Sequence, residues 1–340
     1  MQTKINAEVM KRVNRDRILG LIRKKAVSRA EIARETGLTR AAVSFIVDGL
    51  LSEGRITEGK TVESGGGRPA VLLHIDPKFG TAFGISILRN FYKVGLCDYA
   101  GKVLKEEEGV VCPENAEKTL ADIAEKMEKM LSAAKNPVGI GIVAPGPLDK
   151  SRGTLGEVTN FPDWKNRDIC TFFRERFGIF TVLDNISNAL SRAEFLENPQ
   201  CGDRYLELIV DSGFGSSLCD RTDGTVKITE CELGHTTVKT DGARCGCGNI
   251  GCAELYVNEE NYFRSEKTQA EFFSALASVI CNAENAFSVK TVVLYGFMND
   301  GFKEFSARLA GEIEDRRRNI RLLPSALRGK DVFVACQLIF

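Results

Sequence analysis

The sequence lacks any hydrophobic run long enough to cross a membrane. A spanning helix needs about 18 to 20 consecutive apolar residues, and no stretch of the 340 residues approaches that length. The first six residues also lack the apolar core of a secretory signal peptide. These absences predict a cytoplasmic protein without a membrane partner.

A net charge is also lacking, because 46 basic residues balance 46 acidic residues. The balance hides an asymmetry: residues 1–76 contain fourteen Lys and Arg against nine Asp and Glu, so they carry +5 and the remainder carries −5. A small basic part beside an acidic body is typical of a DNA-binding module joined to a domain that does not bind DNA. A basic but merely solvated surface would give the same count.

The length and composition indicate an ordinary globular protein of more than one domain. A chain of 340 residues exceeds one typical hydrophobic core, and 43% hydrophobic with 27% charged residues is a common globular composition. Its eleven cysteines fit a reducing compartment better than a disulfide framework, because disulfide-rich chains are small and secreted.

Three of these cysteines fall within eight residues, in the glycine-rich segment Cys245-Gly-Cys247-Gly-Asn-Ile-Gly-Cys252. His235 lies ten residues upstream and adds a fourth donor, while the other histidine, His74, is far away in the sequence. Three thiolates and one imidazole form a closed tetrahedral zinc set, which is usually structural. Unrelated buried thiols are the alternative, and the intervening glycines disfavour it. The sequence therefore predicts one structural zinc ion per chain.

The basic N-terminal part has the pattern of a helix-turn-helix. Residues 15–24 form an amphipathic pattern, and Ser28-Arg-Ala-Glu31 is a capping box that opens a helix ending at Gly37. Thr39 then caps a third helix that extends to about Ser52. The strand-like residues 70–74 follow a glycine-rich tip, which predicts a β-hairpin wing. We expect the third helix to enter the major groove and the arginines to reach DNA. The residues expected at DNA are Arg29, Thr39, Arg40, Ala41, Ser44 and Arg68.

These motifs resemble a known family. Glu232-Leu-Gly-His235 followed by Cys-x-Cys-Gly-x-x-Gly-Cys-x-Glu254 is similar to the signature of the ROK family of repressors, open reading frames and kinases. The resemblance covers nearly the whole chain and is weaker between residues 258 and 290. It implies an α/β protein: a winged helix-turn-helix (residues 1–76) followed by a two-lobed, actin-like ATPase body (residues 77–340).

The resemblance also shows departures from the kinases of the family. Their first phosphate loop, Asp-x-Gly-x-Thr, is replaced here by a segment with Ser86 for the aspartate and Leu88 for the glycine. Ile186 stands where the kinases have the catalytic aspartate, and removal of such a base typically costs about 10²- to 10⁴-fold in rate. A one-residue gap would instead bring Asp184 near that position. The second phosphate loop (211–217) and the Gly296-Phe297 pair also depart, so we expect no kinase activity.

The sugar-contacting positions of the family are retained. The resemblance places Asn160, Asn185, Glu232, His235 and Glu254 at the sugar hydroxyls. Carboxylates and amides suit this task because each can pair with two adjacent hydroxyls. The alternative is that Glu232 and Glu254 only support the zinc loop. His235 has two ring nitrogens and can serve both zinc and sugar.

The sequence thus predicts a sugar-responsive DNA-binding regulator, expected to repress carbohydrate-utilisation genes. Its partners would be a double-stranded DNA operator, a sugar or sugar phosphate effector, and other copies of itself in a homodimer or homotetramer. One alternative is an ATP-dependent sugar kinase that carries a DNA-binding head. Another is a DNA-binding scaffold whose sugar cleft has also decayed.

Overall fold

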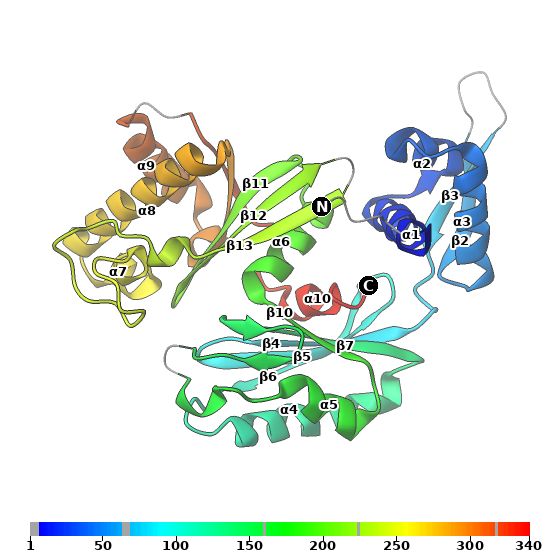
Figure 1. Cartoon of the computed structure of the whole chain (residues 1–340), viewed down its shortest axis with the longest axis horizontal. Coiled ribbons are helices and arrows are strands. Elements are labelled where there is room, and N and C mark those ends of the chain that lie inside the picture. The colour runs from blue at the N-terminus through cyan, green and yellow to red at the C-terminus, as the bar shows by residue number, and fades with distance from the viewer. Residues whose placement is uncertain (1–6, 63–68, 159–160, 223–224, 317–318) are drawn as a thin grey trace.

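A computed structural model describes residues 7–62, 69–158, 161–222, 225–316 and 319–340 (Figure 1). The chain forms a small N-terminal head and a body built on two five-stranded sheets. In the part of the chain that the structure describes, no helix combines the length and apolarity needed to cross a bilayer.

The head consists of three helices and a small antiparallel sheet. The helices are α1 (Ala7–Lys24), α2 (Arg29–Thr36) and α3 (Arg40–Ser52), and the sheet has the order β1-β3-β2, with β1 (Val27–Ser28), β2 (Ile56–Val62) and β3 (Ala70–Ile75). The Ser28–Glu31 capping box is present, and Gly37 ends α2 with a left-handed φ of 69°. The apolar faces of the helices meet β3 in one core that includes Ile18, Val47 and Leu73. The first helix begins at Ala7, eight residues before the predicted start.

The first lobe of the body contains the sheet β10-β7-β4-β5-β6. Strands β4 (Thr81–Ile87), β5 (Phe91–Asp98) and β6 (Val103–Val110) form an antiparallel meander, and β7 (Pro137–Ala144) and β10 (Thr181–Asn185) add in parallel. Helices α4 (Ala116–Met130) and α5 (Ile169–Phe177) cover one face, as Figure 1 shows. The short elements between them are η1 (Leu131–Ala133), β8 (Leu148–Asp149), β9 (Thr154–Leu155) and η2 (Pro162–Trp164).

The second lobe repeats this topology in the sheet β13-β12-β11-β14-β15. Strands β11 (Arg204–Val210), β12 (Phe214–Thr222) and β13 (Thr225–Cys231) are antiparallel, and β14 (Thr291–Gly296) and β15 (Arg321–Pro324) add in parallel. Helices α8 (Glu266–Phe287) and α9 (Phe302–Glu314) pack on its outer face. The remaining elements are α7 (Glu259–Arg264), η3 (Leu233–His235), η4 (Ala253–Leu255) and η5 (Phe297–Asn299).

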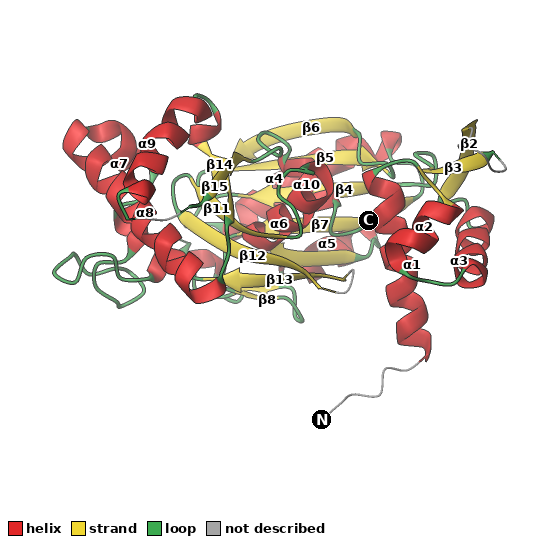
Figure 2. Cartoon of the chain, turned by 90° about the horizontal axis from the view of Figure 1, so that it is seen from above, coloured by secondary structure: helices red, strands yellow, loops and turns green. Residues whose placement is uncertain are grey.

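Two helices lie between the sheets: α6 (Ile186–Glu197) and the C-terminal α10 (Asp331–Cys336) (Figures 1 and 2). The C-terminal helix approaches the first sheet closely because that sheet offers glycines there. A Cβ on Gly84 would lie 2.3 Å from the Val332 carbonyl oxygen, and one on Gly141 would lie 2.0 Å from that of Ala335. The end of the chain therefore belongs to the first lobe.

The head is attached to the body through aromatic and cationic side chains. The Arg23 guanidinium donates to the Tyr99 carbonyl at 2.9 Å and lies 4.6 and 4.8 Å from the rings of Tyr99 and Phe340. Arg55 donates to the Tyr99 hydroxyl at 3.0 Å. The Lys24 ammonium lies 4.6 Å from the Phe195 ring, near the end of α6. Because Asn185, one of the predicted sugar-binding residues, caps the start of α6, the head touches a helix that begins at the predicted sugar site.

Candidate functional site

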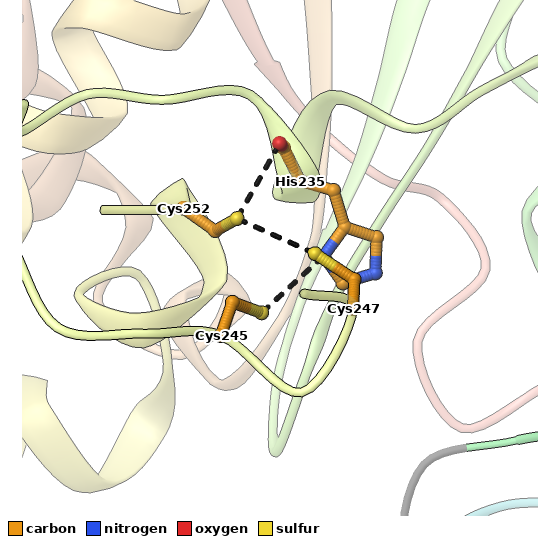
Figure 3. A group of neighbouring side chains, drawn as sticks. All are labelled: His235, Cys245, Cys247 and Cys252. Carbon is orange, nitrogen blue, oxygen red and sulfur yellow. Dashed lines mark hydrogen bonds between the residues drawn. The ribbon is translucent and has the colours of Figure 1, made fainter. Parts of the chain in front are cut away.

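The structure brings the four predicted metal ligands together. The donor atoms of His235, Cys245, Cys247 and Cys252 all lie within 4.8 Å of one another (Figure 3). The His235 Nδ1 atom is 3.7 Å from the Cys245 sulfur, and the sulfurs of Cys247 and Cys252 are 3.6 Å apart. Tetrahedral zinc with bonds of about 2.3 Å to sulfur separates its ligands by roughly 3.8 Å. The residues present therefore fit a zinc ion.

Local backbone bonds shape the cysteine loop. The Cys245 amide donates to the Asn249 carbonyl at 2.8 Å, and the Asn249 side chain donates to the His235 carbonyl at 3.1 Å. A Cβ on Gly251 would lie 1.7 Å from the Lys239 carbonyl oxygen, so only glycine fits this turn, with φ of 65°. The Asn249 backbone amide lowers the pKa of the Cys247 thiol, which favours the metal-binding thiolate.

A cleft of about 260 Å³ opens beside this loop, between the two lobes. Four of the predicted sugar-binding residues line it, and the fifth, Asn160, lies outside the described residues. Burial at the cleft raises the pKa of Glu232. The four lining residues are Asn185, Glu232, His235 and Glu254.

The Asn185 side chain is already held by the protein. Its oxygen accepts from the Ser187 amide at 2.8 Å and so caps α6, while its nitrogen donates to Glu230 at 2.9 Å. The other oxygen of Glu230 accepts from Asn188 at 3.1 Å. Glu230, on β13, was missed by the sequence analysis because nothing in its neighbourhood along the chain distinguishes it from other exposed strand residues.

Arg89 is a second residue that the sequence analysis missed. Its guanidinium crosses from the first lobe to the second, where it pairs with Glu254 at 2.6 Å and approaches the Ser212 carbonyl at 3.5 Å. The other Glu254 oxygen lies 3.6 Å from His235 Nδ1. Glu254 therefore links the metal loop, the cleft and the opposite lobe. Arg89 and Glu254 are 165 positions apart, so the sequence gives no signal for this pair.

The next residues are those that the sequence analysis expects where the kinases bind phosphate. Ser86, which the sequence analysis expects at the position of the kinase aspartate, is fully buried, and its hydroxyl has no partner among the described residues. Ile186, which the sequence analysis expects at the position of the catalytic base, lines the cleft. Asp184 forms an ion pair with Lys150 and accepts from Asn188 at 3.3 Å, and it is not among the cleft-lining residues. Burial, helped by the neighbouring Glu259, raises the pKa of Asp211 to about 6.

The predicted DNA-contacting residues take different positions on the head. Arg40 and Ala41 are exposed at the start of α3, Ser44 is half-buried one turn further on, and the Thr39 hydroxyl accepts from the Ala42 amide as the helix cap. Arg29 is not free, because it pairs with Asp48 at 2.7 Å and with Glu58 at 3.6 Å. Arg68 lies outside the described residues. Phe45 on α3 is 64% exposed and was not among the residues predicted to contact DNA.

The chain was compared with known proteins. A model of the ROK family matches residues 82–285. The xylose repressor of Caldicellulosiruptor bescii is 30% identical over 263 residues, which cover 75% of this chain and 66% of that protein. The N-acetylglucosamine repressor of Escherichia coli is 28% identical over 261 residues, covering 73% and 63%. The chain thus spans about two thirds of the length of these relatives.

Solved structures agree on the fold. A ROK family transcriptional regulator, a homologue of the Escherichia coli MLC protein, superposes with a TM-score of 0.78 at 20% identity and covers 97% of this chain and 96% of its own. A ROK glucokinase from Streptomyces griseus superposes with a TM-score of 0.62 at 19% identity over 76% of this chain and 99% of its own. The two-lobed body therefore has the ROK fold, and the match to the regulator also covers the head. Since the family model spans more than half of the sequence, the chain belongs to the ROK family.

Proposed function

We propose that this protein is a sugar-responsive transcriptional repressor, with a DNA-binding head in residues 1–76 and an effector body in residues 77–340. The observation that carries the proposal is a basic winged head attached to a body whose cleft is lined by Asn185, Glu232, His235 and Glu254. Relatives named as repressors of xylose and N-acetylglucosamine systems support it. The DNA partner would be a double-stranded operator in the cytoplasm.

The body is proposed to bind sugar without phosphorylating it. Phosphoryl transfer needs a metal-coordinating carboxylate and a base that accepts the hydroxyl proton. Ser86 and Ile186 supply neither, and Asp184 is engaged by Lys150. The sugar hydroxyls would instead pair with Glu232, Glu254, Asn160 and Asn185.

Zinc is proposed to have a structural role at this site. His235, Cys245, Cys247 and Cys252 would hold it, and a closed set of four protein ligands leaves no position for a reacting water. Two cleft carboxylates lie close to these ligands in the chain, because Glu232 precedes His235 by three residues and Glu254 follows Cys252 by two. A rigid metal loop would therefore keep both carboxylates at the cleft.

The sugar signal is proposed to reach the head through the lobes. Closure on a sugar would move the lobes relative to each other, and α6 extends from Asn185 at the cleft to Phe195 beside Lys24 of the head. In a homodimer or homotetramer this motion would change the spacing of two winged heads on a two-fold operator. The coupling free energy is the amount by which sugar binding changes the free-energy difference between the two spacings of the heads.

The test is selection of bound fragments from the source genome at near-physiological salt, where non-specific phosphate binding is weak. We expect a discrete, roughly palindromic site that is released by a sugar related to the neighbouring genes. A folded, zinc-loaded protein that enriches no fragment would overturn the proposal. Sugar-dependent release of ADP that is lost in Asp184→Asn would instead favour the kinase alternative.

A further inference from the structure

Phe45 is an apolar side chain in an unusual place. The other large apolar residues of α3 up to Leu50, namely Val43, Ile46, Val47 and Leu50, are buried in the head, whereas Phe45 is 64% exposed. Burial of a phenylalanine ordinarily favours folding, so packing of the head does not explain its place. Single exposed apolar residues are common, so a function for Phe45 has to be inferred from where the residue lies.

The position is the outer face of the helix expected to read DNA. With 3.6 residues per turn, Ala41, Ser44, Phe45 and Asp48 share that face, opposite the buried stripe. Phe45 follows Arg40 by five residues, a rise of about 7.5 Å, or roughly two base pairs. The same five residues turn the helix by about 140°, so Phe45 lies on this face and Arg40 lies beside it, toward the buried stripe.

The surroundings of Phe45 suit a polyanion. The Lys11 ammonium stands 5.1 Å from the centre of the ring, and Arg40 is exposed at the start of the same helix. Asp48, one turn further along this face, is paired with Arg29 at 2.7 Å. The negative charge nearest to Phe45 on this face is thus compensated within the head.

The chemistry of the ring selects its partner. A phenyl ring accepts no ordinary hydrogen bond and donates none, so contact with the polar edge of a G·C pair would leave base donors and acceptors unpaired. The apolar feature of the major groove is the C5-methyl group of thymine. We propose that Phe45 is a specificity-determining residue that packs against a thymine methyl in each half-site of the operator. This inference rests on the proposed DNA-binding function and adds a named base contact to it.

The test uses the full-length protein and the genome-selected operator. Each thymine of one half-site, and its symmetry mate, is replaced by deoxyuridine, which lacks only the methyl group. Affinity is measured by fluorescence anisotropy at fixed salt for the wild type, for Phe45→Ala and for Phe180→Ala. Phe180 is equally exposed, at 64%, but lies on the body and serves as the control.

We expect one thymine position at which the paired deoxyuridine replacements weaken wild-type binding by about fifteenfold, the value for two buried methyl groups, one in each half-site. Phe45→Ala should weaken binding to the natural operator by at least as much and should no longer distinguish thymine from deoxyuridine at that position. Such non-additivity is the signature of a direct contact. Phe180→Ala should behave as the wild type.

A salt titration separates this contact from backbone binding. Phe45→Ala should leave the slope of log affinity against log salt unchanged, whereas Lys11→Gln should reduce it by about one. The inference is overturned if Phe45→Ala stays as sensitive to deoxyuridine as the wild type, or if no thymine position is sensitive. It is also overturned if Phe45→Ala keeps its DNA affinity but changes oligomeric state in sedimentation, because the ring would then contact another copy. A wild type that binds no operator refutes the proposed function itself.

Discussion

The two sides of the interlobe cleft differ in what they keep. On the expected sugar side, Glu232, Glu254 and His235 line the cleft. Beside them is the loop whose four potential metal donors lie within 4.8 Å of one another. On the expected phosphate side, Ser86 is fully buried and the apolar Ile186 lines the cleft. A fold that serves two substrates in the kinases is therefore expected to bind only the sugar here. Recognition needs hydrogen-bonding groups held in place, whereas phosphoryl transfer also needs a metal carboxylate and a base.

The contrast predicts that the metal loop is the most sensitive part of the cleft. Cys247→Ser removes one of four ligands, so we expect loss of the single zinc ion per chain and of every sugar response, because the loop holds Glu254. Zinc content by inductively coupled plasma mass spectrometry is the measurement. Cys231→Ser lies outside the cluster and should retain full zinc. Equal metal content in the two variants would contradict the zinc site.

The next largest effect is expected at the carboxylate that links the loop to the cleft. Glu254→Gln should weaken sugar binding by about tenfold to a hundredfold, since hydrogen bonds to a charged group are the stronger ones. Thermal shift titrations with pentoses, hexoses and their phosphates would measure this loss, with zinc content unchanged. Glu260→Gln is the matched control, because Glu260 is exposed and pairs with Arg264. Equal affinities for both variants would remove Glu254 from the sugar site.

A smaller effect, on stability, is expected from Asp211 on the phosphate side. Its pKa is raised from 3.8 to about 6, so between these values the folded chain binds a proton that the unfolded chain does not. The contribution of protonated Asp211 to the stability of the folded state is fully present below pH 3.8 and is lost as the pH rises through about 6. Asp211→Asn should therefore melt a few degrees above the wild type at about pH 8, and the gap should narrow toward about pH 4. Asp203→Asn, at an exposed carboxylate, should show no such trend.

The smallest effect is expected for kinase activity, which we propose the body lacks. Sugar-dependent ADP release should not exceed background in the wild type, and Ile186→Asp should not restore it, because Ser86 still offers no carboxylate to a metal ion. A coupled assay with the sugar that shifts the melting temperature measures this. Turnover in Ile186→Asp would show that the phosphate side lacks only its base.

Features encoded over short distances along the chain were predictable. The capping box of Ser28 and Glu31, the Thr39 cap and the end of α2 at Gly37 depend on neighbours within a few residues. The cysteine loop was predictable for the same reason. The early start of α1 at Ala7 was not, because helix ends carry a weaker signal than the amphipathic pattern inside the helix.

The sequence by itself determined the family, the winged head and the set of metal donors, because each lies in a contiguous motif whose spacing constrains the backbone. Only the tertiary structure decided the pairing of Arg89 with Glu254, the Asn185–Glu230 bond and the contact of Arg23 with Tyr99 and Phe340. These contacts join residues far apart in the chain. The first two join opposite lobes, whose sheets enclose α6 and α10 through burial of apolar faces, and the third joins the head to the body.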